Sequence, residues 1–175
     1  MTAQLSHWLS MESLRDLIRD PLAYLAALVV VSDQVTKGML GGYLPLHTSK
    51  TIIPGFLDLV HVRNTGAAFS LLAGTQTGLR QCFFVTITIL ALAVMIYLLG
   101  RTPRQEVWTR RGLVLILGGA LGNLVDRLRY GEVIDFLHFH LGGYYWPAFN
   151  VADSAITIGA GILLLLLLKP ATPLK

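Results

Sequence analysis

Four stretches of the chain are apolar over a length that suits a transmembrane helix. They cover about residues 21–40, 82–99, 112–128 and 149–168. Crossing roughly 30 Å of hydrocarbon takes about 20 such residues in a helix. The second stretch carries no charged residue, whereas the others hold polar groups toward one end. This pattern predicts a membrane α-helical fold with four transmembrane helices in a single domain spanning residues 1–175.

The segments between these stretches predict a small β-sheet. In residues 51–64, TIIPGFLDLVHVRN, the turn pair Pro54-Gly55 separates two runs of β-branched and aromatic residues, which is typical of a strand pair. A second turn, Gly142-Gly143, precedes two tyrosines and a tryptophan, side chains that favour the lipid headgroup level. We expect a small periplasmic sheet, or cradle, resting on the outer membrane face.

Basic residues set the expected orientation. The connection at 101–111 contains four arginines, whereas the much longer segment 42–79 contains only Lys50 and Arg63. Cytoplasmic segments are enriched in Lys and Arg, so we expect both termini and the 101–111 connection in the cytoplasm. Residues 10–20 combine charges with regularly spaced apolar side chains, which predicts an N-terminal amphipathic helix lying at the membrane surface.

Composition supports a membrane protein. Of the 175 residues, 54% are hydrophobic and 14% charged, whereas a soluble domain has about 25% charged residues. The net charge is +4, but no basic face with interleaved aromatic residues indicates nucleic-acid binding. The single cysteine, Cys82, excludes a disulfide within the chain.

Ionisable residues inside a membrane are costly and therefore mark candidate functional sites. Asp33 and Lys37 lie four apart with the acid first, which places both on one helix face. Either an anchoring ion pair or direct contact with a substrate would explain them. Asn123, Asp126 and Arg127 also share a face. For Arg127, the sequence leaves open a pair with Asp126, a backbone carbonyl or a lipid headgroup as partner.

The third group joins Asp135 with Asn150 and Asp153. Asn150 and Asp153 lie three apart at the start of the fourth apolar stretch, and Asp135 follows the third stretch within VIDFL. Two carboxylates that return to one membrane face can meet, share a proton and activate a water against a peptide carbonyl. The alternative is that Asp153 caps a helix and Asp135 caps a turn.

Two other classes of protein remain open at this point. A metalloprotease could use His61, His138 and His140 as zinc ligands, although no H-E-x-x-H pattern is present. A small transporter could line a path with the charged residues, but these gather toward one face and no internal repeat is visible. Neither class explains why Asp135, Asn150 and Asp153 gather at one face of the membrane as directly as a pair of catalytic aspartates does.

Five blocks of sequence carry a resemblance to a known family. They are VSDQVTK (31–37), VRNTGAAFS (62–70), GGALGNLVDR (118–127), GEVIDF (131–136) and FNVADSAITIG (149–159). Together, and in this order, they resemble the lipoprotein signal peptidase family, also called signal peptidase II. The blocks extend over most of the chain.

The resemblance implies an aspartyl endopeptidase of the bacterial inner membrane, acting near its periplasmic face. Its substrates would be diacylglyceryl-modified prolipoproteins, cut just before the lipidated lipobox cysteine. It further implies inhibition by globomycin-type cyclic peptides, contact with membrane lipid, and no cofactor or metal; nothing requires more than a monomer. Asp135 and Asp153 match the catalytic positions of the family. Positions that match its substrate-binding or bracing residues are Asp33, Lys37, Asn64, Gly66, Asn123, Asp126, Arg127 and Asn150.

Overall fold

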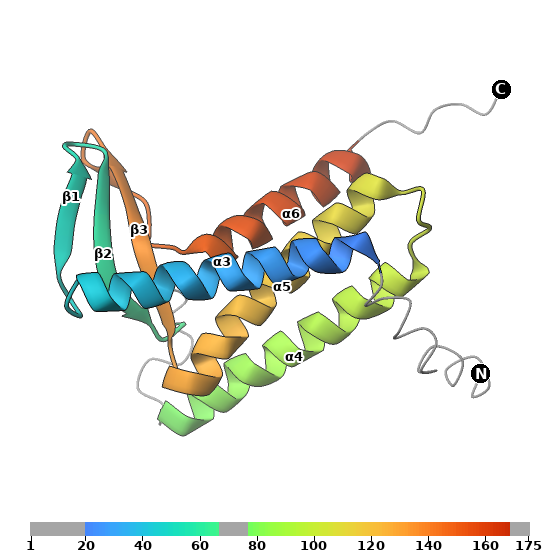
Figure 1. The fold of residues 1–175 in the computed structure, drawn as a ribbon, viewed down its shortest axis with the longest axis horizontal. Helices are drawn as coiled ribbons and strands as arrows, with labels where there is room; N and C mark the ends of the chain where they lie inside the picture. The colour runs from blue at the N-terminus through green and yellow to red at the C-terminus, as the bar shows by residue number, and fades with distance from the viewer. Residues whose placement is uncertain (1–19, 67–76, 169–175) are drawn as a thin grey trace.

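Four helices form the body of the protein (Figure 1). The computed structural model describes residues 20–66 and 77–168. Helix α3 spans Pro21–Tyr43, α4 spans Thr77–Arg101, α5 spans Val107–Tyr130 and α6 spans Val151–Leu167. Helix α5 packs against each of the other three. Each helix covers most of one predicted apolar stretch, while the predicted amphipathic helix at 10–20 lies outside the described residues except for Asp20.

The helices bury charge and expose apolar side chains, the reverse of a water-soluble bundle. Leu28, Leu90 and Leu164 are each more than half exposed, whereas Asp33 and Lys37 are 0% and 3% exposed. Large apolar surfaces of this kind mark contact with another apolar phase. This arrangement suits a helical bundle surrounded by lipid.

Length and composition alone support one crossing among the described helices. Gly78–Arg101 contains a window of mean hydropathy 2.7, and the apolar helix Val151–Leu167 is shorter. Helices α3 and α5 are long enough, but their polar residues lower the average. The four helices are confirmed, while the prediction that all four cross a membrane stays a prediction.

A four-stranded antiparallel sheet lies at one end of the bundle (Figure 1). Its strands are β1 (Ser49–Ile53), β2 (Leu57–Asn64), β3 (Val133–Leu141) and β4 (Tyr144–Tyr145), paired in chain order. The predicted Pro54-Gly55 turn joins β1 to β2, and Gly55 adopts a φ of 74°, which glycine tolerates without strain. The predicted small sheet is therefore confirmed, and its third strand continues from helix α5.

Two glycines of α5 allow its neighbours to approach. A Cβ on Gly119 would collide with the backbone carbonyl of Ala152 in α6, and one on Gly122 would lie 2.8 Å from Oδ2 of Asp33 in α3. Small residues permit such close backbone contacts between helices. Helices α3, α5 and α6 therefore meet closely at the level where the buried polar side chains are found.

Candidate active site

Asp135 lies within strand β3 rather than in a turn. It pairs with Val62 of β2, and its side chain is 2% exposed. The residues from Val133 to Phe136 are all buried, because this part of the sheet lies against helices α3 and α5. The prediction that Asp135 caps a turn is wrong, because the strand continues through this position and holds the carboxylate inside the protein.

Asp153 occupies the first turn of α6 and forms a capping box with Asn150. The backbone N–H of Asp153 donates to Oδ1 of Asn150 over 2.8 Å, and the N–H of Asn150 approaches Oδ2 of Asp153 at 3.4 Å. This reciprocal pattern satisfies N–H groups that a helix start leaves without partners. Asp153 therefore takes part in capping α6, as the alternative interpretation expected, but the N-cap residue itself is Asn150. The same carboxylate also accepts a hydrogen bond from Nδ2 of Asn123 over 2.7 Å.

Asn150 connects the two aspartates directly. While its backbone and Oδ1 engage Asp153, its Nδ2 donates to Oδ1 of Asp135 over 2.8 Å. Its side chain is fully buried. Asn150 thus contacts the Asp135 carboxyl group through its side chain and the Asp153 carboxyl group through its backbone N–H, at the junction between β3 and α6. The two aspartates are 18 residues apart in the chain. The structure brings together the three residues that the sequence analysis grouped.

Asn64 and Gly66 hold the other side of Asp135. Nδ2 of Asn64 donates to Oδ2 of Asp135 over 2.9 Å, and the N–H of Gly66 donates to Oδ1 of Asn64 over 2.8 Å. Gly66 has a φ of 81°, a conformation that favours glycine. Gly66 therefore orients the Asn64 amide so that its NH₂ group faces the aspartate.

Lys37 forms the centre of a second buried network. Its Nζ lies 2.7 Å from Oδ2 of Asp33, 2.7 Å from Oδ2 of Asp126 and 3.1 Å from Oδ1 of Asn123. An ammonium group has three donors, so these contacts use its hydrogen-bonding capacity fully. The predicted Asp33–Lys37 ion pair is confirmed, and Lys37 forms a second ion pair with Asp126 of helix α5.

This network reaches both aspartates through the backbone. Oδ1 of Asp33 accepts from the N–H of Ala152 over 2.9 Å, next to Asp153 in the chain. Oδ2 of Asp126 accepts from the N–H of Ile134 over 3.1 Å, next to Asp135. Lys37 therefore fixes the separation between the start of α6 and the start of β3.

Gln34 is a network member that the sequence analysis missed. Its Nε2 donates to Oδ1 of Asp126 over 2.9 Å and lies 3.2 Å from Oδ2 of Asp33. The only sequence signal was its position inside the block VSDQVTK, because a glutamine beside a charged residue is ordinary on a helix. It supplies an uncharged donor between the two carboxylates.

Arg127 is not used by the Lys37 network. Asp126 pairs with Lys37, and the guanidinium of Arg127 instead lies over the Phe84 ring, 5.3 Å from its centroid. Such a contact leaves the N–H groups at the edge of a guanidinium available. Arg127 is a partly buried cation beside the aspartates, with hydrogen-bonding capacity for a further partner.

Burial is the main influence on the acidity of Asp135. It raises the pKa of this carboxyl group from 3.8 to about 6, and the nearby charge of Asp153 acts in the same direction. Hydrogen bonds from Asn64 and Asn150 lower it in part. A carboxyl group with a pKa in this range can exchange a proton near neutral pH, as acid–base catalysis requires.

The three histidines considered as zinc ligands have other partners. Nδ1 of His61 lies 2.8 Å from the carbonyl oxygen of Leu44, and the rings of His138 and His140 both stack against Tyr145. Across residues 20–66 and 77–168, no three His, Cys, Asp or Glu side chains gather as ligands of one metal ion would.

Known proteins resemble this chain over most of its length. A sequence profile described as signal peptidase (SPase) II matches residues 25–169. The lipoprotein signal peptidase of Syntrophotalea carbinolica is 49% identical over 144 residues, which cover 82% of this chain and 88% of the relative. That of Francisella tularensis subsp. novicida is 46% identical over 151 residues, covering 85% and 93%.

Solved structures of bacterial membrane enzymes also resemble this chain over most of its length. A bacterial membrane enzyme determined by the in meso method at 1.9 Å superposes with a TM-score of 0.75 and 36% identity, covering 86% of this chain and 94% of that one. A second such structure, at 2.3 Å, gives a TM-score of 0.76 and 34% identity, covering 88% and 94%. The chain therefore belongs to the signal peptidase II family.

Proposed function

We propose that this protein removes signal peptides from lipoprotein precursors as an aspartyl endopeptidase, with Asp135 and Asp153 as its catalytic pair. The observation that carries the proposal is the Asn150 side chain, which contacts Asp135 through Nδ2 and the N–H of Asp153 through Oδ1. A structural cap on α6 would need only the second contact. The contact with Asp135 is not needed for capping, and it holds a second carboxyl group beside the start of α6.

The chemistry follows from two nearby carboxyl groups. When they share one proton, the ionised member accepts a proton from a water molecule as its oxygen attacks the scissile carbonyl carbon. The protonated member donates its proton to the carbonyl oxygen, which gives a tetrahedral intermediate. The member that took the water proton then gives it to the amine nitrogen as the C–N bond breaks, while the other member takes back a hydroxyl proton as the new carboxyl group forms. The pKa of about 6 for Asp135 suits this exchange. The mechanism requires no cofactor or metal.

The lipid of the substrate would set the depth of the scissile bond in the membrane. A diacylglyceryl group keeps the modified lipobox cysteine in the bilayer, so the bond preceding that cysteine lies near the headgroup level. Asp135 and Asp153 lie where the sheet meets the helices, at the end of the bundle that would face the periplasm. We propose an inner-membrane protein with four crossings, both termini cytoplasmic, that acts as a monomer and is inhibited by globomycin-type peptides.

The surrounding polar residues would divide between bracing and substrate binding. One group consists of charged residues that form ion pairs with one another: Asp33, Lys37 and Asp126. A second group consists of asparagines that donate hydrogen bonds to Asp135 or Asp153: Asn64, Asn123 and Asn150. We assign these residues, with Gly66, to bracing. Arg127 has donors for a substrate backbone carbonyl or glyceryl ester oxygen, so we assign it to substrate binding.

A gel-shift assay on a precursor lipoprotein tests this function. The purified protein should shorten a diacylglyceryl-modified precursor and leave the same precursor uncut when its lipobox cysteine is replaced by serine. Mass determination of the product should place the lipidated cysteine at its new N-terminus. Cleavage of the unmodified precursor at an equal rate, or at another bond, would contradict the proposed specificity.

A further inference from the structure

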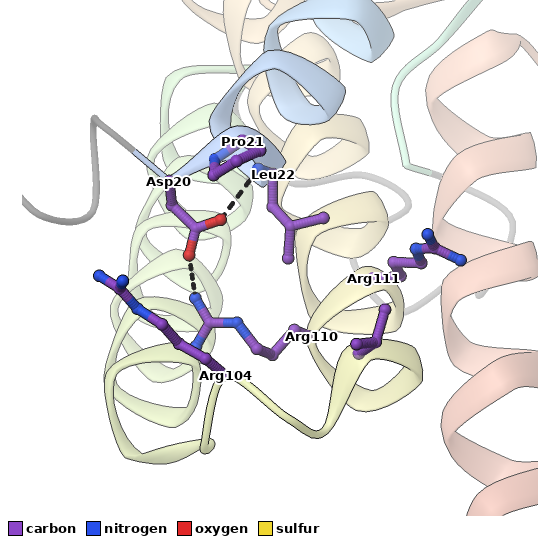
Figure 2. Close-up of a pocket in the computed structure, with 7 residues that line it drawn as sticks. Asp20, Pro21, Leu22, Arg104, Arg110 and Arg111 are labelled. Atoms are coloured by element: carbon purple, nitrogen blue, oxygen red, sulfur yellow. Dashed lines mark hydrogen bonds and ion pairs between the residues drawn. The ribbon is translucent and has the colours of Figure 1, made fainter.

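A basic pocket opens at the end of the bundle opposite the aspartates. It has a volume of about 250 Å³ and lies where the start of α3 meets the connection between α4 and α5 (Figure 2). Three guanidinium groups and one carboxylate line it, a net charge of +2, together with apolar side chains. The lining residues are Asp20, Pro21, Leu22, Arg104, Val107, Arg110 and Arg111.

Arg110 is the buried arginine of this pocket and joins the start of α3 to the end of α4. It is 7% exposed, and its Nη1 donates to the carbonyl oxygens of Leu99 and Thr102 over 3.1 and 2.8 Å. Its Nη2 forms an ion pair with Asp20, which also accepts a hydrogen bond from the N–H of Leu22. Burial acts to raise the pKa of Asp20, but the hydrogen bonds from Leu22 and Arg110 and the positive charges of Arg110 and Arg104 outweigh it and lower the pKa below its usual value. The carboxylate therefore stays charged, and its ion pair is with Arg110.

Arg104 and Arg111 supply the charge that remains. Both side chains are exposed, and within residues 20–66 and 77–168 neither forms an ion pair. In Figure 2, Arg104 lies on the side of Asp20, whereas Arg111 points away from it. The guanidinium of Arg111 lies over the Trp108 ring at 4.9 Å from its centroid. Two exposed arginines that form no ion pair among these residues therefore line the pocket, with the charge of Arg104 also acting on Asp20.

Apolar groups complete the pocket wall. Pro21 and Leu22, at the start of helix α3, line it together with Val107, which is 42% exposed. Trp108 follows Val107 in the chain and is 58% exposed, although it does not line the pocket. Tryptophan favours the boundary between hydrocarbon and headgroups. A ligand that fits must therefore offer negative charge to the arginines and apolar surface to the wall.

We propose that this pocket binds the phosphate group of an anionic membrane lipid, with Arg104 and Arg111 as its ligands. A guanidinium presents a planar fork of donors that matches phosphate oxygens. Basic pockets between helices on the cytoplasmic side suit such headgroups, whose acyl chains would follow the apolar wall. A free phosphate ion would contact the arginines but leave the apolar side chains of the pocket without a partner. An anionic lipid would contact both, so the pocket favours the lipid. The inference rests on the proposed membrane position and orientation, and not on the proposed cleavage.

Native mass spectrometry of the full-length protein in detergent tests the proposal. The probes are phosphatidylglycerol and phosphatidylcholine with identical acyl chains, each titrated separately, and inorganic phosphate at millimolar concentration. The test variant is Arg104→Gln/Arg111→Gln. The matched control, Arg63→Gln/Arg129→Gln, removes two exposed arginines near the sheet, where both stack on Tyr130. The readout is bound lipid, so a failure of peptidase activity would not affect the result.

The wild type should bind phosphatidylglycerol more tightly than phosphatidylcholine. The test variant should bind it about 25-fold more weakly, since each basic side chain near an anionic surface contributes about fivefold, and the control should stay within about twofold of wild type. Arg104→Lys/Arg111→Lys keeps the charge but not the fork and should give an intermediate loss, which keeps the test decisive if the glutamine variant fails to fold. Equal losses in test and control variants, equal binding of both lipids, or complete displacement of phosphatidylglycerol by inorganic phosphate would overturn the proposal.

Discussion

Replacing Lys37 by methionine should destabilise the protein strongly. Methionine preserves most of the side-chain length but removes the positive charge that lies 2.7 Å from both Asp33 and Asp126. These two carboxylates are 0% and 1% exposed, so water cannot replace the lost ammonium without opening the bundle. Removing one partner from a buried charge pair costs about 3–5 kcal/mol of unfolding free energy.

The remaining donors place the expected cost near the lower end of that range. Asp33 keeps the N–H of Ala152, and Asp126 keeps the N–H of Ile134 and the amide of Gln34. Each of these hydrogen bonds to a charged group is worth about 1.5–3 kcal/mol, and they persist in the variant. We therefore expect a loss of about 3 kcal/mol, together with displaced aspartates and reduced cleavage.

Equilibrium unfolding in mixed detergent micelles measures this loss. Lys50→Met is the matched control, because it makes the same substitution on exposed strand β1 and should change the unfolding free energy by no more than about 0.5 kcal/mol. If Lys37→Met kept wild-type stability and only raised the KM for the precursor, Lys37 would be a substrate contact and the bracing account would be refuted.

Three further predictions concern the helix contact, the acidity of Asp135 and substrate binding. Gly119→Ala should cost about 1–3 kcal/mol in unfolding free energy and reduce cleavage, because the new methyl group would meet the α6 backbone; unchanged stability would argue against close helix contact. Folding favours protonated Asp135, whose pKa rises from 3.8 to about 6, so its contribution to stability should be complete below pH 3.8 and lost as pH rises through 6. The melting temperature of the wild type should accordingly fall relative to that of Asp135→Asn between pH 3.8 and 6. Asn64→Leu removes a hydrogen bond that lowers the pKa of Asp135, so it should move this fall to higher pH. A difference in melting temperature between wild type and Asp135→Asn that does not change with pH would contradict the raised pKa. Arg127→Ala should raise KM about tenfold with an unchanged melting temperature, whereas the control Arg129→Ala should leave both unchanged; equal KM values for the two variants would remove Arg127 from the substrate site.

Local patterns predicted much of this fold. The apolar stretches predicted the helices because each is long enough to continue for several turns, and the Pro54-Gly55 pair predicted the first hairpin. Strand β3 was not identified as the partner of β2, because its buried beginning, Val133–Phe136, lacks the alternation that marks a half-exposed strand. A continuous apolar run of this length does not distinguish a strand from a helix.

Sequence spacing predicted the site only where its residues are close in the chain. The four-residue spacing identified Asp33 with Lys37, and the three-residue spacing identified Asn150 with Asp153. The second carboxylate partner of Lys37, Asp126, comes from another helix, and sequence spacing carries no signal for such contacts. The grouping of Asp135 with Asp153 relied instead on a chemical argument, that two carboxylates returning to one membrane face can meet, share a proton and activate a water.

The cleavage rate of a lipidated precursor by Asp135→Asn, Asp153→Asn and the double variant tests the central claim most directly. If the two acids work as one unit on one water, each single variant should lose nearly all activity and the double variant should lose no more than either single one, because the effects of such residues are strongly non-additive. Melting temperatures measured alongside would confirm that each variant is folded. Substantial cleavage by either folded single variant, or losses that multiply in the double variant, would contradict a shared catalytic role for these aspartates.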